Sequence, residues 1–479
     1  MSAVPLTVPA LLAARAEAQP ERAALVMADG RTLTFADWAR RSAAVAGGLS
    51  ARGVRPGDRV VLRFGNHEWL DFAVAYVGTQ WAGAVAVPVS DRLAEAELRQ
   101  VVADCAAVST VDGAAALDAG EPMADPVPGP GDPAQILYTS GTTGRPKGVS
   151  ASHANLTFGC LPGPRRLRLA HSAHFLHAFP IGTNAGQTML VNALDAHPAA
   201  LVLPRFTPGR FARLVAERRV GTAFVVPAMA IELLSSGAAE RFDLSSLRLL
   251  GSTGAALPPA VAAALAAALP GATIVNYYTS TEAAPAQTTM VFDPARPSSV
   301  GRPAAGSGLR IAGPDAATLP VGEVGDVWLR SPAGSRSYYG DPDAGRDVFR
   351  GGWVRMGDLG YLDTEGYLYL VDRESDVVKS GGYKVSTLHV EAALHEHPDV
   401  VEAAAFGVPH PVLGTAVAAA VVARPALSVA GLRAFLASRL APHEVPAPLL
   451  RLDSLPRNDA GKVLKRELRR LAAGEGRQP

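Results

Sequence analysis

Short apolar segments alternate with longer amphipathic ones up to about residue 275 of this 479-residue chain. The apolar segments have the length of strands, and the amphipathic segments extend over several helical turns. Strands that alternate with helices of about 10–15 residues are typical of a largely parallel sheet with helices on its faces. We therefore expect an α/β fold with strands at 23–27, 59–62, 84–88, 220–227, 247–250 and 272–275, and helices at 9–19, 34–52, 69–82 and 259–269.

Length and charge narrow the classes of protein that fit. A chain of 479 residues is long enough for several hydrophobic cores. The formal net charge of +1 argues against a nucleic-acid partner. The two cysteines, Cys105 and Cys160, exclude a disulfide framework and a cysteine metal cluster. The sequence shows neither a signal-peptide pattern nor an apolar run of about 18 residues, which predicts a cytoplasmic chain without a membrane partner.

The string Tyr138–Val149 carries glycines, hydroxyl residues and a lysine directly after the apolar residues Ile136–Tyr138. Glycines let backbone N–H groups turn towards an anion, hydroxyls add donors, and a lysine adds a compact positive charge. The Walker A pattern does not fit, because Pro146 precedes the lysine and Gly148 follows it. A surface turn enriched in Ser and Thr by chance is the other alternative. The candidate phosphate-binding residues are Thr139, Ser140, Gly141, Thr142, Thr143 and Lys147.

This string resembles the phosphate loop of the acyl-adenylate-forming superfamily, which includes acyl-CoA synthetases, adenylation domains and luciferases. Further strings similar to family motifs follow in the family's order at 276–282, 352–359, 372–373, 379–385 and 456–462. The resemblance implies a large N-terminal multi-sheet domain over residues 1–372, a hinge at 373–376, and a small mobile α+β cap over 377–479.

The resemblance also assigns roles around ATP. Tyr278 stacks on the adenine, with Gly254 and Ala255 also at the nucleotide. Asp358 accepts hydrogen bonds from the ribose hydroxyls, and Arg373 contacts ribose or phosphate. Catalytic roles fall to Lys462, Thr281 and Glu282. A carboxylate beside a threonine at the end of a strand is also placed to hold Mg²⁺ against a phosphate, so Glu282 is the expected metal ligand.

Two further groups of residues follow from the cap motifs. The resemblance implies that Gly381, Gly382 and Lys384 line the tunnel for the attacking thiol, where glycines leave room for a narrow arm. Ser375 stands where the family usually carries Asp or Lys, so the hinge is expected at Ser375 and Asp376.

The acid pocket departs most from the family pattern. Gly182 and Thr183 replace an aromatic residue and a histidine, and Asn184 follows them. No aspartate lies between Phe179 and Gln187, which argues against an α-amino acid because a buried ammonium needs a partner. Malonate-type members carry an arginine where this chain has Tyr277, and Thr279 replaces a family glycine. We expect a monocarboxylic acid that is aromatic or of medium length.

The implied reaction is ATP-dependent formation of acyl-AMP with release of pyrophosphate, then transfer to a thiol. ATP, Mg²⁺ and CoA are the expected cofactors, with a small carboxylic acid as substrate. Three alternatives stay open: an acceptor phosphopantetheine on an acyl carrier protein, a catalytically silent adenylate-binding homologue, and adenylation of a non-acyl acid.

Overall fold

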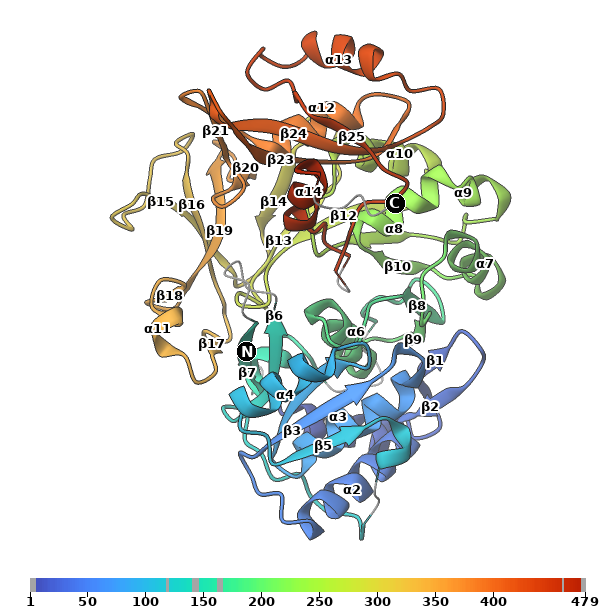
Figure 1. The fold of residues 1–479 in the computed structure, drawn as a ribbon. Coiled ribbons are helices and arrows are strands. Elements are labelled where there is room, and N and C mark those ends of the chain that lie inside the picture. Colours follow the sequence, from blue (N-terminus) through green and yellow to red (C-terminus); the bar gives the residue numbers. More distant parts are fainter. Residues whose placement is uncertain (1–5, 118–119, 140–145, 162–166, 459–460, 475–479) are drawn as a thin grey trace.

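The computed structural model describes residues 6–117, 120–139, 146–161, 167–458 and 461–474 (Figure 1). The described strands form three sheets. Two of them lie in a large N-terminal part and the third in a smaller C-terminal part, and helices pack on the sheets in both parts. The predicted α/β class is confirmed. No described helix combines the length and the apolar character needed to cross a membrane.

The first sheet has the strand order β17-β7-β6-β4-β3-β5. Its four adjacent strands β6, β4, β3 and β5 run parallel. Helix α3 packs on β3 and β4, and α2 packs on α3. The bounds are β3 (Arg59–Phe64), β4 (Val85–Ser90), β5 (Ser109–Asp112), β6 (Pro133–Thr139), β7 (Lys147–Ser152), β17 (Ser337–Tyr338), α2 (Phe35–Ala51), α3 (Trp69–Trp81), α4 (Glu95–Asp104) and α5 (His153–Leu156).

The second sheet begins as a parallel sheet and continues as an antiparallel one, in the order β15-β16-β19-β20-β14-β13-β12-β11-β10-β8-β9-β1-β2. Strands β1 and β8 to β12 are parallel, as expected from the alternation with helices. The parallel strands and their neighbours are β1 (Ala23–Met27), β2 (Thr32–Thr34), β8 (His174–His177), β9 (Ala199–Val202), β10 (Thr222–Val225), β11 (Leu249–Ser252), β12 (Thr273–Tyr278), α1 (Val8–Ala18), α6 (Asn184–Asp195), α7 (Pro208–Arg218), α8 (Pro227–Ser235), α9 (Ala238–Arg241) and α10 (Pro259–Ala268).

The sheet changes character beyond β12, past the stretch for which a parallel sheet was predicted. From there the strands pair antiparallel, and the connections β12–β13, β13–β14 and β19–β20 are short and lack the crossover helix that parallel neighbours need. These elements are β13 (Thr288–Val291), β14 (Ser299–Pro303), β15 (Gly308–Ala312), β16 (Gly325–Arg330), β18 (Phe349–Arg350), β19 (Trp353–Leu362), β20 (Leu368–Arg373) and α11 (Pro342–Gly345).

The third sheet forms the C-terminal part, which we call the cap, and has the order β22-β21-β24-β23 with β25 beside β24. It lies at the top of Figure 1, above the large part of the molecule. Its elements are β21 (Val378–Ser380), β22 (Tyr383–Val385), β23 (Val400–His410), β24 (Gly414–Ala423), β25 (Leu449–Arg451), α12 (Thr387–His395), α13 (Val429–Ala437) and α14 (Lys465–Ala472).

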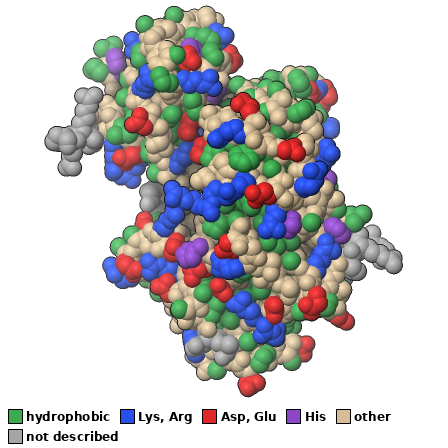
Figure 2. Space-filling model, turned by 90° about the vertical axis from the view of Figure 1, so that its right-hand side faces the viewer, with side chains coloured by type: hydrophobic (Ala, Val, Ile, Leu, Met, Phe, Trp, Pro, Cys, Tyr) green, Lys and Arg blue, Asp and Glu red, His purple; other side chains and the backbone are tan. Residues whose placement is uncertain are grey.

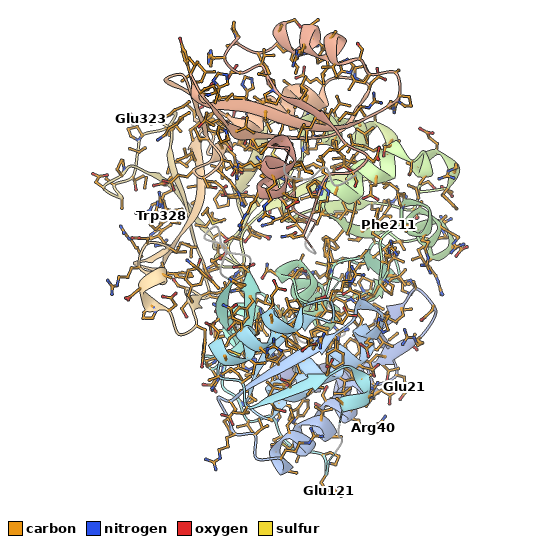
Figure 3. The ribbon with its side chains drawn as sticks, in the orientation of Figure 1. Glu21, Arg40, Glu121, Phe211, Glu323 and Trp328 are labelled. Atoms are coloured by element: carbon orange, nitrogen blue, oxygen red, sulfur yellow. The ribbon has the colours of Figure 1, made fainter. Side chains whose placement is uncertain are left out.

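Local sequence explains where several of these elements begin. Thr34 caps α2 by accepting a hydrogen bond from the backbone N–H of Asp37 at 3.1 Å, as predicted. Side chains fill the space between the ribbons, including the buried Phe211 and Trp328 that Figure 3 labels. The cap has an apolar cluster of its own around Val390, Leu394 and Leu436, separate from the clusters of the large part.

Candidate active site between the large domain and the cap

The predicted site residues of the large part gather where β12 ends beside β19 and β20. Tyr278 is the last residue of β12, and Thr281 and Glu282 follow it in the next turn. Asp358 in β19 pairs directly with Arg373 in β20. Tyr278 and Asp358, which are 80 positions apart, meet through their side chains, although β13 and β14 lie between β12 and β20 in the sheet.

Asp358 is held by two partners on opposite sides of its carboxylate. The hydroxyl of Tyr278 donates to Oδ2 at 2.6 Å, and Nε of Arg373 lies 3.4 Å from Oδ1. Burial raises the pKa of Asp358, while Arg373 and the hydrogen bond from Tyr278 oppose that shift. Burial and the neighbouring Asp358 also raise the pKa of Tyr278. The arrangement fixes a carboxylate with two acceptor oxygens, which suits a vicinal diol.

Lys462 reaches this site from the cap. It keeps solvent-exposed surface, yet the atoms packed around it disfavour its charged form. This desolvation and Arg373 lower the pKa of Lys462, whereas Glu282 and Asp358 favour its charge. The ammonium group of Lys462 therefore lies within electrostatic range of both carboxylates.

The loop that carries Lys462 packs against the large domain. Gly461 has φ +79°, and a Cβ built there would lie 3.2 Å from Cγ2 of Val226. A Cβ at Gly254, with φ +88°, would lie 3.4 Å from Cγ1 of the same valine. The lysine loop and the turn at Gly254 and Ala255 are therefore neighbours, and both need the left-handed backbone that glycine tolerates.

Glu282 follows the end of β12, and Tyr338 connects it to the stem of the phosphate loop at Lys147. Tyr338 donates its hydroxyl to Oε1 of Glu282 at 3.3 Å, and Nζ of Lys147 lies 4.8 Å from the centre of the Tyr338 ring. Thr139 pairs with Lys147 across β6 and β7, so both stems of the loop are placed. The predicted loop residues Ser140, Gly141, Thr142 and Thr143 lie outside the described residues.

Glu282 suits a metal that brings further ligands with it. Mg²⁺ takes oxygen ligands in octahedral geometry, and usually one or two carboxylates with phosphates and waters. The described residues contain no group of three or more His, Cys, Asp or Glu side chains that could hold a metal. A Mg²⁺ ion at Glu282 would thus depend on a polyphosphate, which fits a nucleotide-bound ion.

Three residues of this region were not predicted from the sequence. Arg336 donates to the carbonyl oxygen of Thr281 at 2.8 Å, and Tyr338 contacts Glu282. Both contacts span more than 50 positions, and no sequence pattern marks them. Asn276 could have been found, because it lies two positions before Tyr278 on the same strand face. Its Oδ1 is buried without a hydrogen-bond partner, so it can accept from a base.

The expected acid-pocket residues lie on the other face of β12 and at the start of α6. Thr183 caps α6 by accepting from the N–H of Gly186 at 3.0 Å, and Asn184 is the first residue of the helix. The rings of Tyr277 and Phe224 are 6.4 Å apart, and a Cβ on Gly251 would lie within 3.0 Å of both. An aromatic wall thus replaces the arginine of malonate-type members.

Two further residues predicted for the acid pocket, Thr279 and Gly182, lie against backbone atoms. Thr279 donates its hydroxyl to the carbonyl oxygen of Ala286 at 2.6 Å, which anchors the turn after β12. Gly182 lies near the backbone of β4, where a Cβ would sit 3.5 Å from the N atom of Ser90. Of the predicted acid-pocket residues, Tyr277 is the one with an aromatic ring, and this ring lies beside Phe224.

The predicted tunnel residues lie away from this site. Gly381, Gly382 and Lys384 are exposed on the β21–β22 hairpin of the cap. Next to them Tyr383 stacks on His443 with ring centres 4.1 Å apart. In this orientation the cap presents Lys462 to the large domain and leaves the hairpin in solvent.

Hydrogen bonds join the two sides of the predicted hinge. Asp372 accepts from both the backbone N–H and the hydroxyl of Thr387, and Ser386 donates to the carbonyl oxygen of Val371 at 2.6 Å. Burial raises the pKa of Asp372 to about 6. The expected hinge residue Asp376 lies 3.3 Å from Nζ of Lys465, and the Ser375 hydroxyl donates to Asp376 at 3.4 Å. These contacts hold the cap in the observed orientation.

Positive side chains concentrate near the junction of the two parts. Figure 2 shows Lys and Arg side chains along the notch between the upper and lower lobes. Clustered positive charge at a narrow site favours anionic ligands.

Comparisons with known proteins agree with this geometry. The AMP-binding enzyme family matches residues 12–121 and 108–339, and the AMP-binding enzyme C-terminal domain matches residues 389–462. A feruloyl-CoA synthase from Amycolatopsis is 36% identical over 95% of this chain and 97% of the relative. A sulfoacetate–CoA ligase from Cupriavidus necator is 32% identical over 96% of this chain and 97% of its own length. Among solved structures, ATP-bound MatB from Rhodopseudomonas palustris has a TM-score of 0.85 at 29% identity, covering 97% of this chain and 99% of MatB.

Proposed function

Because this chain belongs to the AMP-binding enzyme family and is an acid–CoA ligase, we propose that it activates an aromatic monocarboxylic acid in two half-reactions. The observation that supports the proposed mechanism is that the cap loop before Lys462 packs on Val226 beside the turn at Gly254, within electrostatic range of Glu282 and Asp358. A cation that reaches from the cap towards the side of the large domain that carries two carboxylates can help to hold a polyphosphate and a carboxylate together.

In the first half-reaction a carboxylate oxygen of the acid attacks the α-phosphorus of ATP, and pyrophosphate leaves. Lys462 offsets the charge that develops on the phosphoryl oxygens. Asp358 and Arg373 hold the ribose, and Asn276 accepts from the adenine amine beside Tyr278. Mg²⁺ held by Glu282 would neutralise phosphate charge. Catalysis of this kind depends mainly on positioning and on charge stabilisation.

In the second half-reaction the thiol of CoA attacks the acyl carbonyl, and AMP leaves. The exposed β21–β22 hairpin must then replace Lys462 at the site, which requires the cap to turn about residues 373–376. Gly381 and Gly382 would give passage to the pantetheine arm. The hydrogen bonds of Asp372 and Ser386 across this segment would break as the cap turns.

The acid is proposed from the wall of the pocket. Tyr277 and Phe224 offer aromatic faces, and aromatic pairs favour tilted or edge contacts with a flat substrate. The feruloyl-CoA synthase relative is named for an aromatic acid, whereas the sulfoacetate–CoA ligase is named for a small dianion. No arginine stands at position 277, which favours the aromatic acid.

The test is one incubation of the protein with ATP, Mg²⁺, CoA and a mixture of acids, followed by mass spectrometry of acyl-AMP and acyl-CoA. Acyl-CoA from aromatic acids alone is the expected result. Acyl-AMP without acyl-CoA would point to a carrier protein as the thiol donor. Neither product from a broad panel would contradict the proposed function.

Replacing Tyr277 by Ala should change which acids are used. The variant removes a ring from the pocket wall, so we expect kcat/KM for a benzoate-sized acid to fall by about 10-fold and that for a bulkier acid to rise. Competition between the two acids measures the change. Tyr361→Ala, in a ring stack on β19 and β20, is the matched control. A parallel fall for both acids would show that Tyr277 does not select by size.

A further inference from the structure

Arg336 places a guanidinium inside the large domain, with 5% of the residue exposed. Its Nη1 donates to the carbonyl oxygen of Thr281 at 2.8 Å and to Oδ1 of Asn184 at 3.2 Å. Its Nε is buried and has no hydrogen-bond partner. One side chain therefore joins the start of α6, in the acid pocket, to the segment that carries Glu282.

The charge of Arg336 is not neutralised by a directly bonded carboxylate. Among the described residues no Asp or Glu oxygen lies within 4.0 Å of its guanidinium. Burial lowers the pKa of Arg336 to about 10, with Tyr76 and Glu282 opposing the shift. A buried cation that meets only neutral acceptors is costly to the fold.

A structural role alone explains this arrangement poorly. If Arg336 only tied β17 to the domain, an apolar side chain of similar size could fill the same space, and such replacements are often neutral or stabilising. The positive charge lies instead near Glu282 and is bonded to Asn184 of the acid pocket. An anionic substrate that binds there would add to the more distant negative charge of Glu282, since no described carboxylate lies within 4.0 Å of Arg336.

We propose that Arg336 is a positioning residue for acid activation, which holds Asn184 and the Thr281–Glu282 segment in one arrangement and favours the anionic carboxylate through its buried charge. This inference rests on the proposed function and deepens it. It names a residue that selects for the ionised acid, and it separates the acid-binding step from later steps. Acyl-AMP no longer carries a free carboxylate, so the thiol step should not depend on this charge.

The test compares Arg336→Met, Arg336→Lys and Asn184→Ala in both half-reactions. In ATP–pyrophosphate exchange, Arg336→Met should raise the KM for the acid by about 10²-fold, because a charge-assisted interaction is lost. The KM for ATP and the rate of acyl-CoA formation from supplied acyl-AMP should change by less than about threefold. Arg336→Lys keeps the charge and should recover at least about 10-fold of the lost affinity.

Controls separate this role from a general loss of structure. Arg346→Met removes an arginine that directly follows helix α11 and whose side chain is 76% exposed, and it should behave as wild type. Equal losses in both half-reactions without recovery by lysine would overturn the proposal, as would an unchanged KM for the acid in Arg336→Met.

Two further outcomes are also decisive. If Arg336→Met does not fold, Asn184→Ala should still raise the KM for the acid by about 10-fold. In that case the proposal is overturned if neither Asn184→Ala nor Arg336→Lys changes this KM. Absence of exchange with any acid in the wild-type protein would contradict the proposed function, whereas normal wild-type exchange with unaffected variants contradicts this inference alone.

Discussion

Replacing Lys462 by Ala should slow acyl-AMP formation by about 10²–10³-fold, the effect typical of removing one charge aimed at a transferring phosphoryl group. The structure places this ammonium where Glu282 and Asp358 favour its charged form. The alanine variant removes the cap charge that would offset the charge developing on the phosphoryl oxygens. Acyl-CoA formation from supplied acyl-AMP should be nearly unchanged, because the hairpin, and not Lys462, would then face the site.

Single-turnover release of pyrophosphate measures the first step, and the conversion of synthetic acyl-AMP measures the second. Arg466→Ala is a suitable control, since it removes an exposed cation four residues further along the same segment. Equal losses in both half-reactions for Lys462→Ala would refute a role confined to adenylation.

Replacing Gly381 by Leu should have the opposite signature. Gly381 has φ +54° in the β21–β22 hairpin, and a Cβ there would lie 2.9 Å from Cδ2 of Leu413. A branched side chain would therefore obstruct the thiol passage and shift the hairpin. We expect pyrophosphate release to persist while thioester formation falls by about 10²-fold or more. A small misplacement of reacting groups can cost that much in rate.

The same two assays check this variant, with acyl-CoA as the second product. Gly366→Leu is the matched control, because Gly366 also has a left-handed φ, of +79°, with open space around it and no place in the proposed site. Normal acyl-CoA output from Gly381→Leu would remove the hairpin from the thiol path.

Local patterns predicted the first half of the fold well. The cap of α2 at Thr34 and the parallel strands β10, β11 and β12 follow from hydroxyl placement and apolar runs that act over a few residues. The antiparallel strands from β13 onwards lack such a signal. Their pairing is set by which neighbours lie close in space, and short exposed strands such as β17 carry little pattern.

The site shows the same division. Glu282, Asp358 and Lys462 could be proposed because each stands in a recognisable string. Arg336 and Tyr338 could not, since their importance arises from contacts with Thr281 and Glu282 that exist only after folding. The orientation of the cap could not be predicted either, because the sequence carries the motifs proposed for both half-reactions and neither marks which of them faces the large domain.

The bonds from Thr387 to Asp372 and from Ser386 to Val371 bear on the speed of a complete cycle. Each round of synthesis would break and remake them. Their strength would therefore affect two rates in opposite directions, the rate of adenylate formation and the rate of thioester formation. Stronger bonds would favour the cap orientation for adenylation and so speed acyl-AMP formation, but they would slow the attack of the thiol on the adenylate. Weaker bonds would speed the thiol step but would leave a smaller fraction of the enzyme in the orientation that uses ATP. A bond to a charged group is worth about 1.5–3 kcal/mol, enough to shift this balance by an order of magnitude or more.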